Sequence, residues 1–302
     1  MKALKGIYAP ILTPFQNHDQ IHWSSLERHV RWLVDSGIHG IFALGSTSEA
    51  MFMPLTKKKQ LAQGIHSLVP PEVPVIFQTG CNSLEETLVL SQYVLGLGAK
   101  TLSILTPSYY TLDDDSLATY YSRISREFPK VPLCVYNFAS RTNNDITPAL
   151  LKRLASESPD IVGIKESTES VKRLQEHVEK NRDLSILAGT NSHIVTALRH
   201  GCSGAVATLS NVVPSLLVEL YEAGVAGQWD KASECQSAIA EVRKLLKSLG
   251  PDLQVYKKAT EVFGGFAFGG MYPPHRELTD DEHARIRELI QRFQENTVFA
   301  VR

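Results

Sequence analysis

Short apolar, β-branched segments recur along the chain with amphipathic stretches between them, and this alternation constrains the fold more than any other feature. It is typical of a parallel sheet whose strands are joined by helical crossovers. Eight strand–helix units in about 225 residues predict a closed (β/α)8 TIM barrel. The predicted strands are Gly6 to Leu12, Gly40 to Leu44, Val73 to Gln78, Thr101 to Leu105, Val131 to Tyr136, Ile161 to Lys165, Leu184 to Ala188 and Gly204 to Ala207.

Helix signals lie between these strands. Ser24 with Glu27 predicts a capping box, and Thr147-Pro148 predicts a helix with proline in its first turn. The remaining predicted helices are Thr56 to Leu68, Leu84 to Leu97, Ser116 to Phe128, Val171 to Lys180, Ser192 to His200 and Pro214 to Ala223, followed by three further helical stretches from about Trp229 onward. We therefore expect a barrel catalytic domain over residues 1–226 and a C-terminal helical domain over residues 227–302.

An open, doubly wound sheet that binds a dinucleotide is the rival fold. Its signature is a glycine-rich turn directly after the first strand. The GxG in "LGLGAK" instead follows a predicted helix and precedes a strand, so Gly96 and Gly98 are interpreted as helix C-caps.

Composition excludes several classes of function. With 31 basic and 32 acidic residues, the formal net charge is -1, which gives no electrostatic footprint for nucleic acid. No apolar run approaches the roughly 18 residues of a membrane span, and the N-terminal segment lacks a signal-peptide core. The four cysteines are scattered without a CxxC pair. These features predict a soluble, cytoplasmic protein with no nucleic-acid or membrane partner.

Chemistry in such a barrel is carried at the carboxyl ends of the strands, where this sequence places several polar segments. They are "GSTSEA" after the second strand, "TPSYYTL" after the fourth, "YNFASRTNND" after the fifth, Lys165 at the end of the sixth and "AGTN", which includes Gly189, after the seventh. The ten histidines form no HExxH or carboxylate–histidine cluster, so we expect neither a metal nor a cofactor.

One lysine among hydroxyls and phenols suits amine catalysis through an imine. A lysine with its ordinary pKa of roughly 10.4 is protonated at neutral pH, whereas burial at a barrel mouth would disfavour the ammonium. Taken alone, the position of Lys165 at a strand end favours a snorkelling surface charge. The coincidence of polar groups at one end of consecutive strands favours the buried amine.

Each neighbouring residue also has a structural interpretation. Tyr136 can be a core tyrosine with a satisfied hydroxyl, and Arg141 can pair with Asp145. Ser46 and Thr47 can cap the next helix, with Glu49 as the capping-box acid.

The segments "GSTSEA", "TPSYY", "VYN" and "GIKEST", in this order, resemble the dihydrodipicolinate synthase and N-acetylneuraminate lyase family of class I pyruvate aldolases. The resemblance runs from about Gly6 through Pro214. It implies a (β/α)8 barrel with a helical C-terminal domain, assembled as a homotetramer that is a dimer of dimers.

The resemblance also implies roles for individual residues. Lys165 matches the lysine that forms a Schiff base with pyruvate, and Tyr136 the tyrosine that moves protons over the imine. Ser46 matches the hydroxyl that links Tyr136 to a second phenol, for which Tyr109, reaching in from a neighbouring subunit, is the candidate. The substrate-binding candidates are Thr47 for the pyruvate carboxylate, Val206 beside the pyruvate moiety, Arg141 for a distal carboxylate, and Gly189.

Several positions depart from the family pattern. Ser48 replaces a glycine, which adds a side chain near the carboxylate pocket and is expected to alter a turn that uses glycine's backbone freedom. Asn143 stands where a glycine is expected after Thr142, and Ser46 is serine, as in the lyases. "GTN" replaces the "GDD"-like sequence of the synthases, and the polar set that binds sialic acid is not visible at residues 190–193.

These features predict a Schiff-base-forming, pyruvate-dependent carbon–carbon lyase acting on a 2-oxo acid of the 2-keto-3-deoxy sugar acid type. The alternatives are 4-hydroxy-tetrahydrodipicolinate synthase, a 2-keto-3-deoxy acid dehydratase of the same fold, and a non-catalytic keto-acid sensor.

Overall fold

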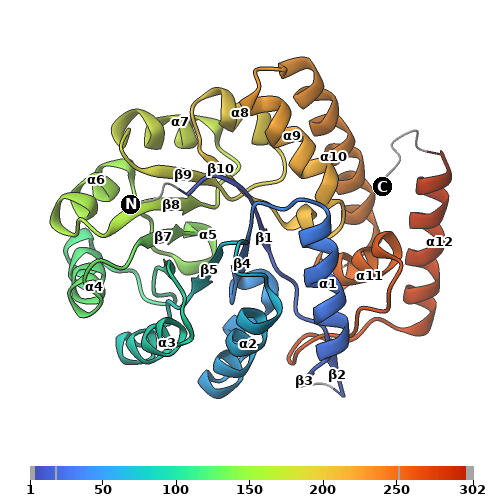
Figure 1. The fold of residues 1–302 in the computed structure, drawn as a ribbon, viewed down its shortest axis with the longest axis horizontal. Helices are drawn as coiled ribbons and strands as arrows, with labels where there is room; N and C mark the ends of the chain where they lie inside the picture. The colour runs from blue at the N-terminus through green and yellow to red at the C-terminus, as the bar shows by residue number, and fades with distance from the viewer. Residues whose placement is uncertain (1–3, 18, 251, 297–302) are drawn as a thin grey trace.

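The computed structural model of the protein describes residues 4–17, 19–250 and 252–296, and its centre is a closed barrel of eight parallel strands (Figure 1). The strands neighbour one another around the barrel in chain order. Every predicted strand segment overlaps one barrel strand, so the predicted (β/α)8 barrel is confirmed. The barrel strands are β1 (Gly6–Pro10), β4 (Gly40–Ala43), β5 (Val75–Gln78), β6 (Leu102–Leu105), β7 (Leu133–Asn137), β8 (Ile161–Glu166), β9 (Ser185–Ala188) and β10 (Gly204–Val206).

Helices alternate with the strands along the chain and surround the barrel (Figure 1). They are α1 (Trp23–Asp35), α2 (Leu55–Leu68), α3 (Leu84–Leu97), α4 (Asp114–Glu127), α6 (Pro148–Glu157), α7 (Val171–Lys180), α8 (Ile194–Arg199) and α9 (Pro214–Val225). The C-terminal helices, drawn from orange to red in Figure 1, are α10 (Trp229–Leu249), α11 (Asp252–Gly264) and α12 (Asp280–Asn296). They lie together at one side of the barrel. The predicted boundary at residues 226/227 falls just before α10 and stays a prediction, and residues 1–3 and 297–302 of the predicted domains lie outside the described residues.

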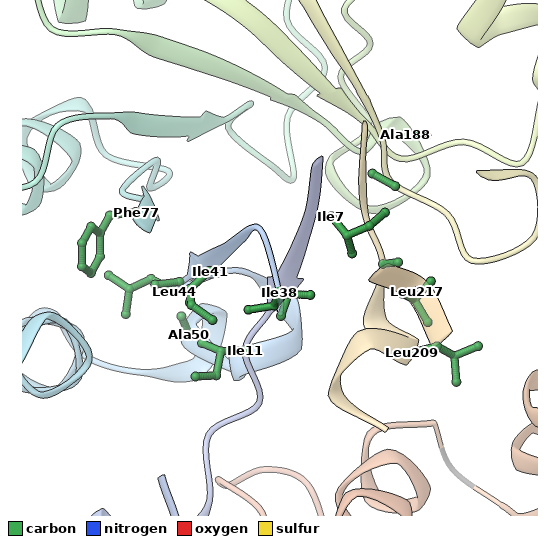
Figure 2. Close-up of a cluster of buried hydrophobic side chains, with 14 of the residues drawn as sticks. Ile7, Ile11, Ile38, Ile41, Leu44, Ala50, Phe77, Ala188, Leu209 and Leu217 are labelled. Carbon is green, nitrogen blue, oxygen red and sulfur yellow. The ribbon is translucent and has the colours of Figure 1, made fainter. Parts of the chain in front are cut away.

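Strand alternation divides the core into two clusters, because successive side chains of a strand point to opposite faces. The outer cluster holds residues such as Ile7, Ile41 and Phe77 (Figure 2). The inner cluster holds the intervening residues, for example Tyr8 and Phe42. The two clusters therefore show which strand side chains face the barrel axis.

The capping residues at the helix ends agree only in part with the predicted ones. Thr147 caps α6 by accepting a hydrogen bond from Leu150 N, with Pro148 in the first turn, as predicted. The predicted capping box of Ser24 and Glu27 is wrong: the N-cap of α1 is His22, two residues earlier, and its side chain accepts the hydrogen bond from Ser25 N. Gly98 is the left-handed C-cap of α3, with φ of 107°.

Gly96 is not a cap, because it lies inside α3, which ends at Leu97. The sequence also missed three short elements: the hairpin of β2 (Phe15–Gln16) and β3 (Gln20–Ile21), and the one-turn helix α5 (Ala139–Thr142). Elements of two to four residues are too short to carry a periodic signal. Across the described part of the chain, no helix combines the length and apolarity that spanning a membrane requires.

Candidate active site

Lys165 lies near the carboxyl end of β8, and its side chain points into the barrel. Its strand neighbour Ile164 belongs to the outer cluster, so alternation directs Lys165 inward. The residue is only 5% exposed. The structure therefore supports the buried amine over the snorkelling surface charge.

Two aromatic rings hold the amine. Nζ of Lys165 lies 3.9 Å from the ring centroid of Tyr136 and 4.1 Å from that of Phe42. The two rings meet edge to face at 5.6 Å, and both residues are buried. A cation within about 6 Å of a ring face is attracted by its quadrupole. Phe42 was missed by the sequence reading, although its place between Ile41 and Ala43 on β4 predicts an inward side chain.

Two titratable groups of the inner cluster, Tyr8 and Cys134, are neutral at neutral pH. Burial raises the pKa of the Tyr8 hydroxyl to about 12. It also raises the pKa of the Cys134 thiol to about 12, although the charge of Lys165 opposes this shift. Both groups thus stay protonated near neutral pH and place no anion beside the amine.

A cavity of about 960 Å³ opens at the carboxyl ends of the strands. Its lining includes loop residues that follow the barrel strands from β4 onward, together with residues of α10 and α11. Leu105 and Phe138 line the cavity and also pack in the inner cluster with Tyr136. Lys165 and Tyr136 do not line it themselves, but Tyr136 packs in the same cluster as these two lining side chains.

Ser46 and Thr47 line the cavity from the turn that follows β4. This turn is a short 3-10 helix, η1 (Ser46–Ser48), and neither end of it has a side-chain cap. Both residues are half-buried, which places them between the inner cluster and solvent. Capping of the next helix by Ser46 or Thr47 is therefore not observed.

Ser48 does not disturb this turn as expected. The prediction that the turn needs glycine's backbone freedom at this position is wrong, because the left-handed residue is the next one, Glu49, with φ of 61°. The Ser48 hydroxyl turns back to donate to Gly45 O at 2.8 Å. Ser48 is 1% exposed and does not line the cavity.

Tyr109 lies away from the barrel interior. It is 82% exposed, has a left-handed φ of 83°, and contacts the exposed Tyr110 at 5.0 Å between ring centroids. No hydrogen bond joins the side chains of Ser46, Tyr136 and Tyr109, all three of which the structure describes. The predicted relay is thus not assembled within one chain and stays a prediction.

Arg141 extends over the cavity from α5. Its guanidinium lies 5.9 Å from the Phe138 ring centroid, and its side chain is exposed. The alternative pairing with Asp145 is not formed, because Asp145 binds Arg173 at 2.7 Å.

Asn143, which replaces the expected glycine, keeps a left-handed φ of 61° and donates to Thr111 Oγ1 at 2.6 Å. Asparagine tolerates this conformation better than most residues.

Val206 and Gly189 complete the predicted set. Val206 lies on β10 in the inner cluster with Tyr136 and is buried. Gly189 follows β9, donates from its backbone N to Glu166 O at 2.7 Å, and leaves no space for a side chain because a Cβ would collide with Ser167 Oγ. The structure thus brings Lys165, Tyr136 and Val206 into one cluster, whereas Gly189 supports the strand ends.

The sequence did not predict a polar network that lies on the opposite face of β8 from Lys165. Glu166 follows Lys165 and points to the opposite face of the strand, where its Oε2 accepts from Asn137 Nδ2 at 2.8 Å and from His177 Nε2 at 3.0 Å. Asn137 likewise follows Tyr136, and the two strand pairs are in register. The network joins β7 and β8 on the side away from the cavity. Within the described residues, no group of three or more His, Cys, Asp or Glu side chains is placed to hold a metal ion.

The fold and the site together define a (β/α)8-barrel protein with an inward lysine and a cavity at the carboxyl ends of its strands. The sequence model of the dihydrodipicolinate synthetase family matches residues 3–293, so the chain belongs to this family, whose members are lyases.

Relatives of this chain within the family are named for different activities. The chain is 32% identical over 284 residues to an uncharacterized DapA-like lyase of Halobacterium salinarum, covering 94% of this chain and 92% of the relative. It is 27% identical to the 4-hydroxy-tetrahydrodipicolinate synthase of Methanospirillum hungatei, with 96% and 99% covered. YagE of Escherichia coli K12, whose name provisionally assigns it 2-dehydro-3-deoxy-D-gluconate aldolase activity, is 28% identical, with 96% and 97% covered. A crystal structure of YagE with pyruvate superposes with a TM-score of 0.90 at 27% identity, covering 96% and 98% of the two chains.

Proposed function

We propose that this protein is a Schiff-base-forming, pyruvate-dependent carbon–carbon lyase that acts on a 2-oxo acid of the 2-keto-3-deoxy sugar acid type. The observation that carries the proposal is the placement of Lys165. Its amine is buried between the rings of Tyr136 and Phe42, in the cluster that also contains Leu105 and Phe138 of the cavity lining. The pyruvate bound in the crystal structure of the similar YagE supports the choice of ligand.

The reaction follows from amine chemistry. Lys165 Nζ adds to the C2 ketone, and loss of water gives an iminium that withdraws electrons from C3. Removal of the C4 hydroxyl proton then breaks the C3–C4 bond, releasing an aldehyde and leaving an enamine on the lysine. Protonation at C3 and hydrolysis of the imine release pyruvate and regenerate the amine.

Neighbouring residues supply the proton transfers and the binding groups. In this proposal Tyr136 moves protons at the imine and the C4 hydroxyl, and Ser46 connects it to Tyr109. Thr47 holds the pyruvate carboxylate, Val206 packs beside the pyruvate methyl carbon, and Gly189 keeps the strand end free of side-chain atoms.

Tyr109 requires a second subunit in this scheme. Its side chain is 82% exposed and makes no hydrogen bond to Ser46 or Tyr136 of its own chain, which is consistent with a role in a neighbouring site. We therefore propose that the dimer is the catalytic unit of a homotetramer. The cysteines are all free thiols, which suits the cytoplasmic location proposed from the sequence.

The substrate assignment rests on the space and charge above Lys165. A cavity of about 960 Å³ has room for a sugar acid, and Arg141 is exposed on its lining to bind a distal anionic group. The planar guanidinium fork binds a carboxylate through two parallel hydrogen bonds. The same arginine supports 4-hydroxy-tetrahydrodipicolinate synthase as a second candidate, since the aldehyde partner of that reaction carries a carboxylate, whereas a sugar acid with one acid group has its carboxylate on the pyruvate half.

Borohydride trapping tests the proposal. The protein is incubated with pyruvate and sodium borohydride, and peptides are examined by mass spectrometry. We expect one reduced pyruvyl group on the peptide that contains Lys165 and none in Lys165→Ala. Lys58→Ala is the matched control, because Lys58 also lines the cavity but should not react. An unmodified Lys165 in the wild-type protein would reject the mechanism.

An adduct without turnover would have a different meaning. If pyruvate is trapped on Lys165 but no aldehyde or sugar acid in a broad panel is condensed or cleaved, the non-catalytic sensor replaces the lyase. Release of water rather than an aldehyde from a 2-keto-3-deoxy acid would identify the dehydratase.

A further inference from the structure

Glu49 is the residue through which the turn after β4 contacts the C-terminal part of the chain. It directly follows η1, the turn that carries Ser46 and Thr47, and its side chain is fully buried. Its expected role as a capping-box acid is not observed, because Glu49 makes no side-chain cap hydrogen bond to η2 (Ala50–Phe52). Its carboxylate instead turns toward the C-terminal segment.

Three donors from that segment reach the Glu49 carboxylate. Lys257 Nζ of α11 donates to Oε1 at 2.5 Å. Tyr272 N and His275 Nδ1 both contact Oε2 at 2.9 Å. All three contacts bridge more than 200 residues of sequence. Both carboxylate oxygens of Glu49 thus accept hydrogen bonds from the C-terminal part of the chain.

Lys257 is buried, like its partner Glu49. It is 2% exposed, donates a second hydrogen bond to Gly270 O at 2.6 Å, and lies 4.8 Å from the Phe15 ring centroid. Burial lowers the pKa of Lys257, while the charge of Glu49 opposes that shift. Removing one member of such a pair leaves the other charge buried without compensation.

The backbone of Glu49 adds a reason for this anchoring. A non-glycine residue with φ of 61° is held in a sparsely populated conformation, which persists only when surrounding contacts fix it. The residue joins η1 to η2, so its conformation sets the direction in which the turn leaves Thr47. The carboxylate contacts help to fix it, together with the backbone hydrogen bonds from Glu49 N to Ser46 O and from Phe52 N to Glu49 O.

We infer that Glu49 and Lys257 are positioning residues, through which α11 fixes the turn of Ser46 and Thr47 at the height needed to bind the pyruvate carboxylate. The inference rests on the proposed function, because it assigns the turn its role in binding pyruvate. It makes the C-terminal helical part a component of the active site although none of its residues needs to touch pyruvate.

The experiment measures the pyruvate concentration that half-saturates borohydride trapping on Lys165, separately from the trapping rate at saturating pyruvate. The variants are Glu49→Gln and Lys257→Met. A misplacement of the carboxylate-binding turn is expected to raise the half-saturating concentration about tenfold or more, with the saturated trapping rate changed much less.

Lys258→Met is the matched control. Lys258 is the next residue of the same helix and is also buried, but it pairs with Glu261 rather than with Glu49. The same substitution there should leave the half-saturating concentration unchanged. If Lys258→Met raises it as much as Lys257→Met does, the effect is general loosening of α11 and the inference is wrong.

Two further variants keep the test decisive. The double variant Glu49→Gln/Lys257→Met leaves no unpaired charge, so its effect should be clearly smaller than the product of the single effects. Lys257→Arg keeps the charge and should retain part of the affinity for pyruvate, which also covers the case in which Lys257→Met does not fold. Independent, multiplicative effects would overturn the inference.

The results distinguish a failure of this inference from a failure of the proposed function. Absence of a Lys165 adduct in the wild-type protein would reject the lyase itself. A normal wild-type adduct, combined with unchanged half-saturation in Glu49→Gln and Lys257→Met, would reject only the positioning role.

Discussion

Nζ of Lys165 lies 3.9 Å from the ring centroid of Tyr136, and the two residues are register partners on the adjacent strands β8 and β7. Their contact is therefore set by strand pairing and not by a loop. The following pair in the same register, Asn137 and Glu166, is joined by a hydrogen bond of 2.8 Å on the outer face. The amine and the phenol are thus held by a rigid part of the barrel, as a preorganised site requires.

Tyr136→Phe should slow turnover without abolishing imine formation. The ring contacts with Phe42 and Phe138 do not involve the hydroxyl, so the fold around Lys165 should be kept. Loss of the proton-transferring hydroxyl is expected to lower kcat by about 10²-fold or more. Steady-state cleavage of a 2-keto-3-deoxy sugar acid, with prolonged borohydride trapping alongside, measures both effects. Wild-type kcat in this variant would show that another group moves the proton.

Arg141→Ala should affect only substrates with a distal anionic group. Loss of a charge-assisted hydrogen bond is expected to lower kcat/KM for such substrates by about 10-fold to 100-fold and to leave uncharged aldehyde partners unaffected. Lys247→Ala is the control, because Lys247 is an exposed cation that lines the same cavity from α10. Equal losses on charged and uncharged partners would argue against a clamp. The substrates most affected would also distinguish the aldolase from the synthase.

Ser48→Gly should destabilise the protein without improving its affinity for pyruvate. Ser48 does not have a positive φ, so glycine relieves no strain there, and its Oγ bond to Gly45 O is lost. Together with the greater backbone entropy of glycine, this should cost about 1–2 kcal/mol in the free energy of unfolding. Urea denaturation measures the change, and Ser48→Ala isolates the part due to the hydroxyl. A stabilised Ser48→Gly variant would contradict the observed backbone geometry.

His29 should make the protein less stable in acid. It is fully buried with its Nε2 at 2.8 Å from Asn211 Oδ1, and burial lowers its pKa from 6.5 to about 4. As pH falls below 6.5, the unfolded chain takes up a proton that the folded chain refuses until about pH 4. The free energy of unfolding should therefore fall by about 3 kcal/mol across this window.

The control for this prediction is His29→Gln, which keeps an N–H donor near Asn211 but cannot titrate. Urea unfolding measured between pH 4 and pH 7 should show a shallower pH dependence in this variant than in the wild-type protein. Parallel curves for the two proteins would mean that other groups account for the acid sensitivity.

Local patterns were sufficient to predict much of this structure. The eight barrel strands were predictable because each is an apolar segment bounded by turn residues, and α7 was predicted with its observed ends. The two-residue strands β2 and β3 and the cap at His22 were not, because neither a periodic signal nor a standard capping residue marks them. The left-handed position in "GSTSEA" was placed one residue too early, at Ser48 instead of Glu49, since a sequence does not show which residue takes the strained conformation.

The sequence by itself determined the number and order of the strands and the place of Lys165 at the end of the sixth, because hydrophobic periodicity is a local property of the chain. Only the tertiary structure decided that the Lys165 amine contacts Phe42 as well as Tyr136, that Tyr109 is exposed, and that Glu49 binds Lys257 across 208 positions. Barrel closure and the docking of α11 create these contacts. No local pattern encodes a partner that is chosen by packing between distant segments.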